Sequence, residues 1–65
     1  MARFRIRQNN ITVAEAVGPN AEHYIWHYAF QYREDGDVTI QHNANGRWKR
    51  FAFLTHWQNK KDESK

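Results

Sequence analysis

Alternating arginines near the N-terminus are the residues whose type and spacing most directly suggest a binding chemistry. Arg3, Arg5 and Arg7 alternate with Phe4 and Ile6, and in an extended strand this spacing puts all three guanidinium groups on one face. Guanidinium groups pair with phosphates, and an exposed indole can stack on an unpaired base. In the sheet expected below, polar residues and a tryptophan from a second hairpin share this face. The candidate nucleic-acid-binding residues are Arg3, Arg5, Arg7, Gln41, Trp48 and Arg50.

The same pattern also has a purely structural interpretation. Alternating arginines keep the outer face of a soluble sheet hydrated and protect its edges, and Trp48 could pack over the alkyl parts of Arg5 or Arg50. The chain contains no RNA-binding sequence motif, and its net charge of +3 permits an anionic partner without requiring one. We therefore treat binding of single-stranded nucleic acid as the alternative hypothesis for the function and not as the leading one.

A second candidate surface is an aromatic pair in the middle of the chain. If this segment is helical, Trp26 and Phe30 lie one turn apart and face away from the apolar stripe, flanked by His23 and His27. A contiguous pair of exposed aromatic rings indicates a contact site. A domain this small also gains stability from self-association. We therefore predict a protein interface at these four residues, formed with a second copy or with another protein.

The two central histidines do not make a convincing metal site. His23 and His27 are spaced to point the same way on a helix, where they could fill two zinc coordination positions. The chain has no cysteine, and Tyr24 stands where the zinc metalloprotease motif has glutamate. We predict no metal site. Because such a histidine pair titrates near neutral pH, an interface that contains it could respond to acid.

Residues for catalysis are nearly absent from the sequence. There is no cysteine, the single serine is Ser64, and no glycine-rich phosphate loop or carboxylate pair in a cleft can be recognised. A chain of 65 residues with one helix also leaves little room for a substrate pocket. We predict no enzymatic activity, no cofactor and no small-molecule substrate.

Length and composition predict one small domain. No apolar run approaches the about 18 residues of a membrane span, and the N-terminus lacks the apolar core of a signal peptide. With no cysteine to form disulfides, the chain is compatible with a reducing compartment, and we expect a cytoplasmic protein without a membrane partner. Residues 1–57 are predicted to fold, and residues 58–65 to be a disordered polar tail.

The stretch from Gly18 to Asp37 determines the fold class. Asn20 is a good N-cap residue, Glu22 suits the first turn of a helix, and Gly36 suits a left-handed residue just after its end. Between them, an apolar stripe recurs at three- and four-residue steps: Ala21, Tyr24, Ile25, Tyr28, Ala29 and Tyr32. We predict a helix from Asn20 to Asp35. The alternating aromatics from Tyr24 to Tyr32 keep a strand, and with it a small all-β barrel, as the alternative.

Two hairpins are predicted on either side of this helix. Asn9 and Asn10 tolerate positive φ, and a two-residue loop there pairs Ile6 with Val13. This register leaves Glu15 on the apolar face unless a bulge intervenes. The apolar face would carry Phe4, Ile6, Ile11 and Val13.

Asn45-Gly46 is the strongest hairpin signal in the chain. A two-residue loop there pairs Ile40 with Phe51 and Val38 with Phe53 on the apolar face. On the opposite face it pairs Gln41 with Arg50 and Asn43 with Trp48.

The predicted fold is therefore α+β, with the order ββαββ and the helix packed on a four-stranded, mostly antiparallel sheet. The strand order stays open. The predicted function is a non-catalytic protein-interaction or accessory module that self-associates through the aromatic pair. Nucleic-acid binding on the arginine-rich sheet face is the alternative.

Overall fold

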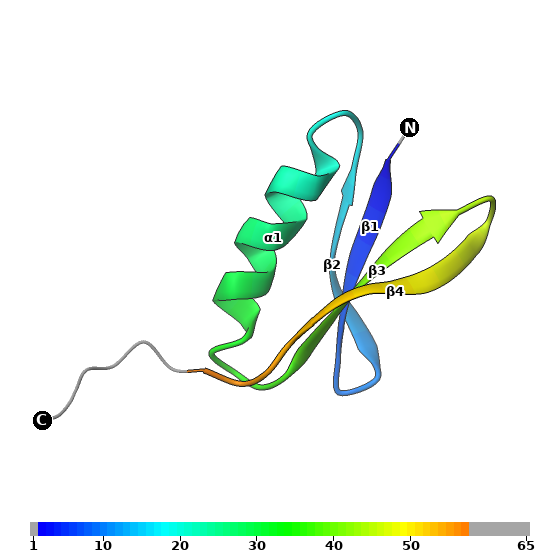
Figure 1. Cartoon of the computed structure of the whole chain (residues 1–65). Helices are drawn as coiled ribbons and strands as arrows, with labels where there is room; N and C mark the ends of the chain where they lie inside the picture. Colours follow the sequence, from blue (N-terminus) through cyan, green and yellow to red (C-terminus); the bar gives the residue numbers. More distant parts are fainter. Residues whose placement is uncertain (1, 58–65) are drawn as a thin grey trace, which may run out of the picture.

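One helix packs on one face of an antiparallel sheet (Figure 1). The computed structural model describes residues 2–57. Its elements are β1 (Arg3–Gln8), β2 (Ile11–Val17), α1 (Ala21–Tyr32), β3 (Val38–Ala44) and β4 (Arg47–Leu54). The four strands form an open sheet in the order β2-β1-β3-β4, and each neighbouring pair is antiparallel. The predicted ββαββ fold is confirmed, and the barrel alternative is wrong. The predicted C-terminal tail lies outside the described residues.

The helix begins where the sequence indicates and ends earlier than expected. Asn20 occupies the N-cap position, although its side chain makes no capping hydrogen bond, and Glu22 lies in the first turn. α1 ends at Tyr32, and the chain continues through a tighter turn in which Asp35 N donates to Tyr32 O over 2.9 Å. Gly36 has a positive φ of 154°, but it lies four residues beyond Tyr32, so it is not the residue directly after the helix that the sequence suggested.

Gln8, the last residue of β1, closes this end of the helix. Its side-chain Nε2 donates to Tyr32 O over 2.8 Å and to Gly36 O over 3.2 Å. The residue is only 8% exposed, so one buried amide supplies a hydrogen bond to Tyr32 O, which has no partner within the helix, and another to Gly36 O in the turn that follows.

The core lies between α1 and the two central strands. Ala21, Ile25 and Ala29 form the buried ridge of the helix, and their i, i+4 spacing keeps them on one line. They meet the inward side chains of the sheet, which are Phe4, Ile6, Val38, Ile40 and Leu54. Tyr28 and Tyr32 are half-buried beside this ridge, whereas Tyr24, predicted to face inward, is 50% exposed.

A bulge changes the register of the first hairpin. Asn9 and Asn10 both have positive φ, as the two-residue turn requires, and Arg7 lies opposite Thr12. The register then shifts, so that Ile6 lies opposite Ala14 and not Val13. The bulge moves Glu15 away from the core to the side of the arginines, which resolves the conflict in the predicted register. Ile11, predicted to be on the apolar face, is exposed at the strand's start.

The second hairpin contains a corresponding bulge. The Asn45-Gly46 turn is present, and Gln41 and Asn43 lie opposite Arg50 and Trp48 as predicted. Beyond this point Phe51 is the extra residue of β4, because Ile40 lies opposite Ala52. The predicted pairs of Ile40 with Phe51 and of Val38 with Phe53 are therefore wrong. The smaller Ala52 and the buried Leu54 occupy the core positions instead, and Phe51 and Phe53 remain exposed.

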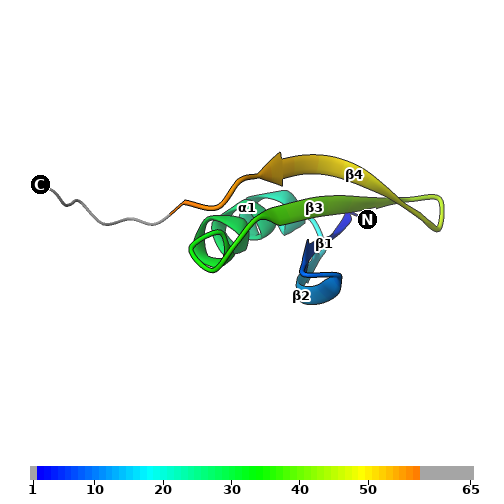
Figure 2. The ribbon, with the colours of Figure 1, turned by 90° about the horizontal axis from the view of Figure 1, so that it is seen from below.

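The position of the helix leaves two surfaces uncovered. α1 packs mainly against β1, β2 and β3, and β4 forms the far edge of the sheet (Figure 2). One uncovered surface is the helix-free face of the sheet. The other lies on the helix side, between α1 and β4. All of the predicted site residues except His23 border one of these two surfaces.

Candidate binding surfaces

The helix-free face of the sheet gathers the predicted nucleic-acid-binding residues. Arg5 of β1 lies opposite Gln41 of β3, and Gln41 lies opposite Arg50 of β4. Since side chains alternate along a strand, Arg3 and Arg7 share this face with Arg5, and Trp48 shares it with Arg50. We call this surface the arginine face; its members are Arg3, Arg5, Arg7, Gln41, Trp48 and Arg50.

Arg5 is the centre of this face. Its Nε donates to Gln41 Oε1 over 2.6 Å, and its guanidinium carbon lies 4.1 Å from the centroid of the Trp48 ring. The guanidinium carbon of Arg3 lies 5.6 Å from the same ring. Both distances are within the range of cation–π attraction. Trp48 is consequently half-buried, and it holds the guanidinium of Arg5 in place instead of presenting a bare ring to solvent.

The other two arginines of β1 bind groups from the neighbouring strand and turn. Arg7 Nη1 donates to Thr12 Oγ1 over 2.9 Å, and its Nη2 donates to Asn10 O over 2.8 Å. Arg3 Nη2 lies 3.9 Å from Glu15 Oε1. This ion pair is exposed and long, so it neutralises Arg3 only weakly.

Charge is divided between the strands and the helical side of the molecule. The described strands carry six basic residues against the single acid Glu15: Arg3, Arg5, Arg7, Arg47, Lys49 and Arg50. α1 and the turn after it carry four acids against the single base Arg33: Glu22, Glu34, Asp35 and Asp37. The modest net charge of the chain therefore conceals a strongly basic sheet.

Aromatic rings form the second surface. Trp26 lies 6.1 Å from Phe30 and 6.2 Å from Phe51, measured between ring centroids. The guanidinium carbon of Arg33 lies 5.9 Å from the Phe30 ring and 5.7 Å from the Trp57 ring. We call this group the aromatic surface; its members are Trp26, Phe30, Arg33, Phe51 and Trp57.

Trp26 does not face away from the core, contrary to the prediction from helical spacing. It is half-buried and packs against the core on the flank of α1 nearest β4. Phe51 provides a partner for the indole there, because its ring stays on the helix side of the sheet despite the bulge, 5.0 Å from Phe4 between ring centroids. Phe30, one turn later, stays 52% exposed.

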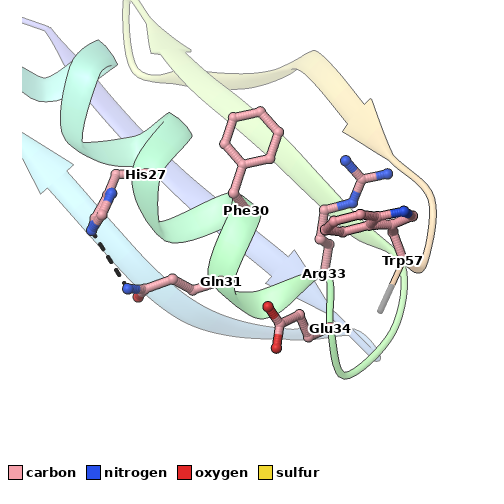
Figure 3. A pocket seen from close by; sticks show the side chains of 6 residues that line it. All are labelled: His27, Phe30, Gln31, Arg33, Glu34 and Trp57. Atoms are coloured by element: carbon pink, nitrogen blue, oxygen red, sulfur yellow. Dashed lines mark hydrogen bonds between the residues drawn. The ribbon is translucent and has the colours of Figure 1, made fainter. Parts of the chain in front are cut away.

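An open pocket of about 650 Å³ adjoins the aromatic surface at the end of the helix (Figure 3). It is lined by His27, Phe30, Gln31, Arg33, Glu34 and Trp57. Arg33 fixes one wall: its Nε donates to Thr55 O over 3.0 Å, and its own carbonyl accepts from Trp57 N over 3.0 Å. The pocket thus has aromatic walls and carries both a cation and an anion.

The two helical histidines do not act together. His27 lines the pocket, where its Nε2 lies 3.5 Å from Gln31 Nε2, whereas His23 is exposed beside Tyr24 with 5.5 Å between ring centroids. Within residues 2–57, no group of three or more metal-ligating side chains comes together. His23 is therefore the one predicted interface residue that lies apart from both the aromatic surface and the pocket beside it.

Several residues of these surfaces were not predicted as site residues. Phe51 was assigned to the core because a bulge has no clear local signature, and Trp57 joins the aromatic surface only through tertiary contacts with Arg33. Arg47 and Lys49 could have been found from the density of basic residues around Trp48. Their position on the other side of β4 from Arg50 follows from strand alternation.

The chain matches no known protein-family model, no curated protein and no solved structure. In the described part of the chain, no helix is long and apolar enough to cross a membrane. Functional inference therefore rests on the chemistry of the arginine face and the aromatic surface.

Proposed function

We propose that this protein is a small non-catalytic module that binds nucleic acid through the arginine face. The observation that carries the proposal is the division of charge, in which the basic residues gather on the strands and the acidic ones on the helical side. A phosphate backbone approaching the sheet would meet guanidinium groups with one carboxylate among them, and the acids opposite would orient the molecule during approach.

The side chains of this face suit phosphate recognition. The guanidinium of Arg5 is held by Gln41 and Trp48, so little side-chain entropy remains to be lost when it binds an anion. Arg50 is exposed on β4, where it can form a bidentate contact with phosphate oxygens.

Salt dependence tests this proposal directly. Each phosphate contact contributes about 0.9 to the slope of log K against log salt on duplex DNA and about 0.7 on single strands. Arg50→Gln should lower that slope by about 0.7–0.9 in fluorescence-anisotropy titrations with labelled oligonucleotides. Arg33→Gln changes the net charge equally but lies on the acidic side, so it should leave the slope unchanged. Failure of any oligonucleotide to bind at low salt would refute the proposal.

Self-association is a second candidate function, favoured by the exposure of the aromatic surface. We propose that a second copy of the chain binds to this surface. The pocket carries both Arg33 and Glu34, and a two-fold axis through it could pair each arginine with the partner's glutamate, as a self-complementary interface requires. A standard interface of about 800 Å² per partner would cover roughly a sixth of the 4575 Å² accessible surface.

A matched pair of substitutions on one helix tests self-association. Phe30 and Tyr24 are 52% and 50% exposed, but only Phe30 belongs to the aromatic surface. Phe30→Ser should reduce the mass measured by sedimentation equilibrium to that of a monomer, and Tyr24→Ser should not. A wild-type protein that stays monomeric at high concentration would exclude the homodimer.

A further inference from the structure

The end of the β3–β4 hairpin forms a two-stranded ribbon. β1 pairs with β3 only from Thr39 to His42, so in the described structure Asn43 and Ala44 pair with β4 alone. Both views of the fold show this end of the hairpin reaching beyond the other strands and the helix (Figures 1 and 2). We call residues 42–49 the ribbon; its base is the pair of His42 and Lys49, where His42 still lies opposite Phe4 of β1.

The turn at the tip of the ribbon is well defined. Asn45 and Gly46 have φ values of 56° and 82°, the left-handed conformations of a type I′ turn. Asn43 Oδ1 accepts a hydrogen bond from Gly46 N over 3.2 Å. The strands on either side are therefore held in register up to the tip.

Basic side chains lie on both faces of this hairpin end. Lys49 lies opposite His42 and Arg47 opposite Ala44, and strand alternation puts both on the helix side of the sheet, beyond the end of the core. Arg50 lies on the arginine face, where Arg3 and Arg5 also meet Trp48. The ribbon, together with Arg50 of the adjoining arginine face, can thus meet phosphates on two sides at once.

The geometry of Trp48 argues against stacking of unpaired bases. Single-strand binders rely on open aromatic rings that stack on successive bases. The Trp48 ring is half-buried and is covered by the guanidinium of Arg5 at 4.1 Å. Binding a base there would first require breaking this cation–π contact and would leave the arginine less well oriented.

We infer that the ribbon enters the major groove of double-stranded DNA, an inference that rests on the proposed nucleic-acid function. The major groove of B-form DNA is about 12 Å wide and admits a two-stranded ribbon, whereas the deep, narrow major groove of A-form RNA does not. Arg47 and Lys49 contact the phosphates along one wall of the groove. Arg50 and the neighbouring arginine face contact those along the other.

The test compares three ligands of matched sequence and length: duplex DNA, duplex RNA and single-stranded DNA. We expect the 65-residue chain to bind duplex DNA at least tenfold more tightly than the other two at the same salt concentration. Arg47→Gln combined with Lys49→Gln should lower the salt slope on duplex DNA by about 1.8, because two phosphate contacts are lost. Arg47→Lys keeps the charge and should retain the slope, and far-UV circular dichroism checks that the variants fold.

The outcomes separate this inference from the proposed function. If the double variant binds duplex DNA like the wild type while Arg50→Gln binds more weakly, the arginine face binds without the ribbon and the inference is wrong. Equal or tighter binding of single strands or of duplex RNA would also overturn it while leaving the proposed function intact. No binding of any of the three ligands at low salt would overturn both.

Discussion

Replacing Gln8 should destabilise the fold far more than a replacement at the end of a strand normally does. The Gln8 amide is the donor for both Tyr32 O and Gly36 O, and it is nearly fully buried. Gln8→Met keeps the length and the apolar contacts of the side chain and removes the amide, including the donor of both hydrogen bonds. The change therefore isolates the two hydrogen bonds.

The expected loss of stability depends on which hydrogen bonds the two carbonyl groups retain in Gln8→Met. Tyr32 O still accepts from Asp35 N at 2.9 Å, so its loss is that of one ordinary hydrogen bond, about 0.5–1.5 kcal/mol. Gly36 O loses a donor inside the protein, which costs about 1–3 kcal/mol. Together they amount to about 1.5–4.5 kcal/mol, a large fraction of the total of roughly 3–10 kcal/mol expected for a domain of this size.

Thermal and urea unfolding followed by circular dichroism would measure the effect. For a domain of this size, about 1 kcal/mol corresponds to roughly 4–8 °C, so the melting temperature of Gln8→Met should fall by at least about 6 °C. A melting temperature within a degree or two of the wild type would show that the Gln8 amide does not support the end of α1, and the reasoning would be wrong.

A second variant at this position checks the chemical cause. In Gln8→Glu, an ionised carboxylate would face two carbonyl oxygens in a buried place, which favours the protonated form and raises its pKa in the folded state. A raised folded-state pKa means that stability is greatest at low pH and is lost as the pH rises through that pKa. The difference in stability from the wild type should therefore narrow on acidification. A constant difference between pH 4 and pH 7 would exclude this explanation.

Two further predictions concern the second hairpin and the flank of the helix. Gly46→Val should lower the free energy of unfolding, measured by urea titration, by about 1 kcal/mol or more. Gly46 has a φ of 82° and no atom lies within 4 Å of an added Cβ, so backbone strain is the whole effect. Gly46→Asn should cost much less in the same titration, because asparagine tolerates this conformation. Trp26→Ala should destabilise the fold by about 3 kcal/mol, because the ring packs against Phe51 and the core. Phe30→Ser should change the stability of the monomer by under about 1 kcal/mol. Equal effects at the two positions would mean that the two rings are equally buried, which would contradict this prediction.

Local signals were sufficient to predict the elements of this fold. Asn9-Asn10 and Asn45-Gly46 define both turns because few residues adopt positive φ without strain. The alternation around Arg5 identified the arginine face correctly, since it depends only on the period of a strand. Near each turn the predicted pairs were right, as Gln41 with Arg50 shows.

The errors begin at the two bulges. Each bulge inserts one residue, Val13 in β2 or Phe51 in β4. Every strand pair farther from the turn than the bulge is shifted by one residue from the predicted register. Nothing local distinguishes Phe51 from an inward residue of an unbroken strand. The bulge is evident only in the tertiary packing, where Ala52 and Leu54 occupy the core positions. The strand order and the contact of Trp57 with Arg33 likewise depend on packing between distant segments, which periodicity does not describe.

The two irregular residues also influence what the sheet edges can do. Val13 lies in β2 and Phe51 in β4, and these are the outermost strands on the two sides of the sheet. An inserted residue twists its strand and interrupts the regular spacing of backbone donors and acceptors that an incoming strand from another molecule would need. Each margin is thereby made a poor template for adding further strands, which should help a small, aromatic-rich sheet resist growing into fibrils.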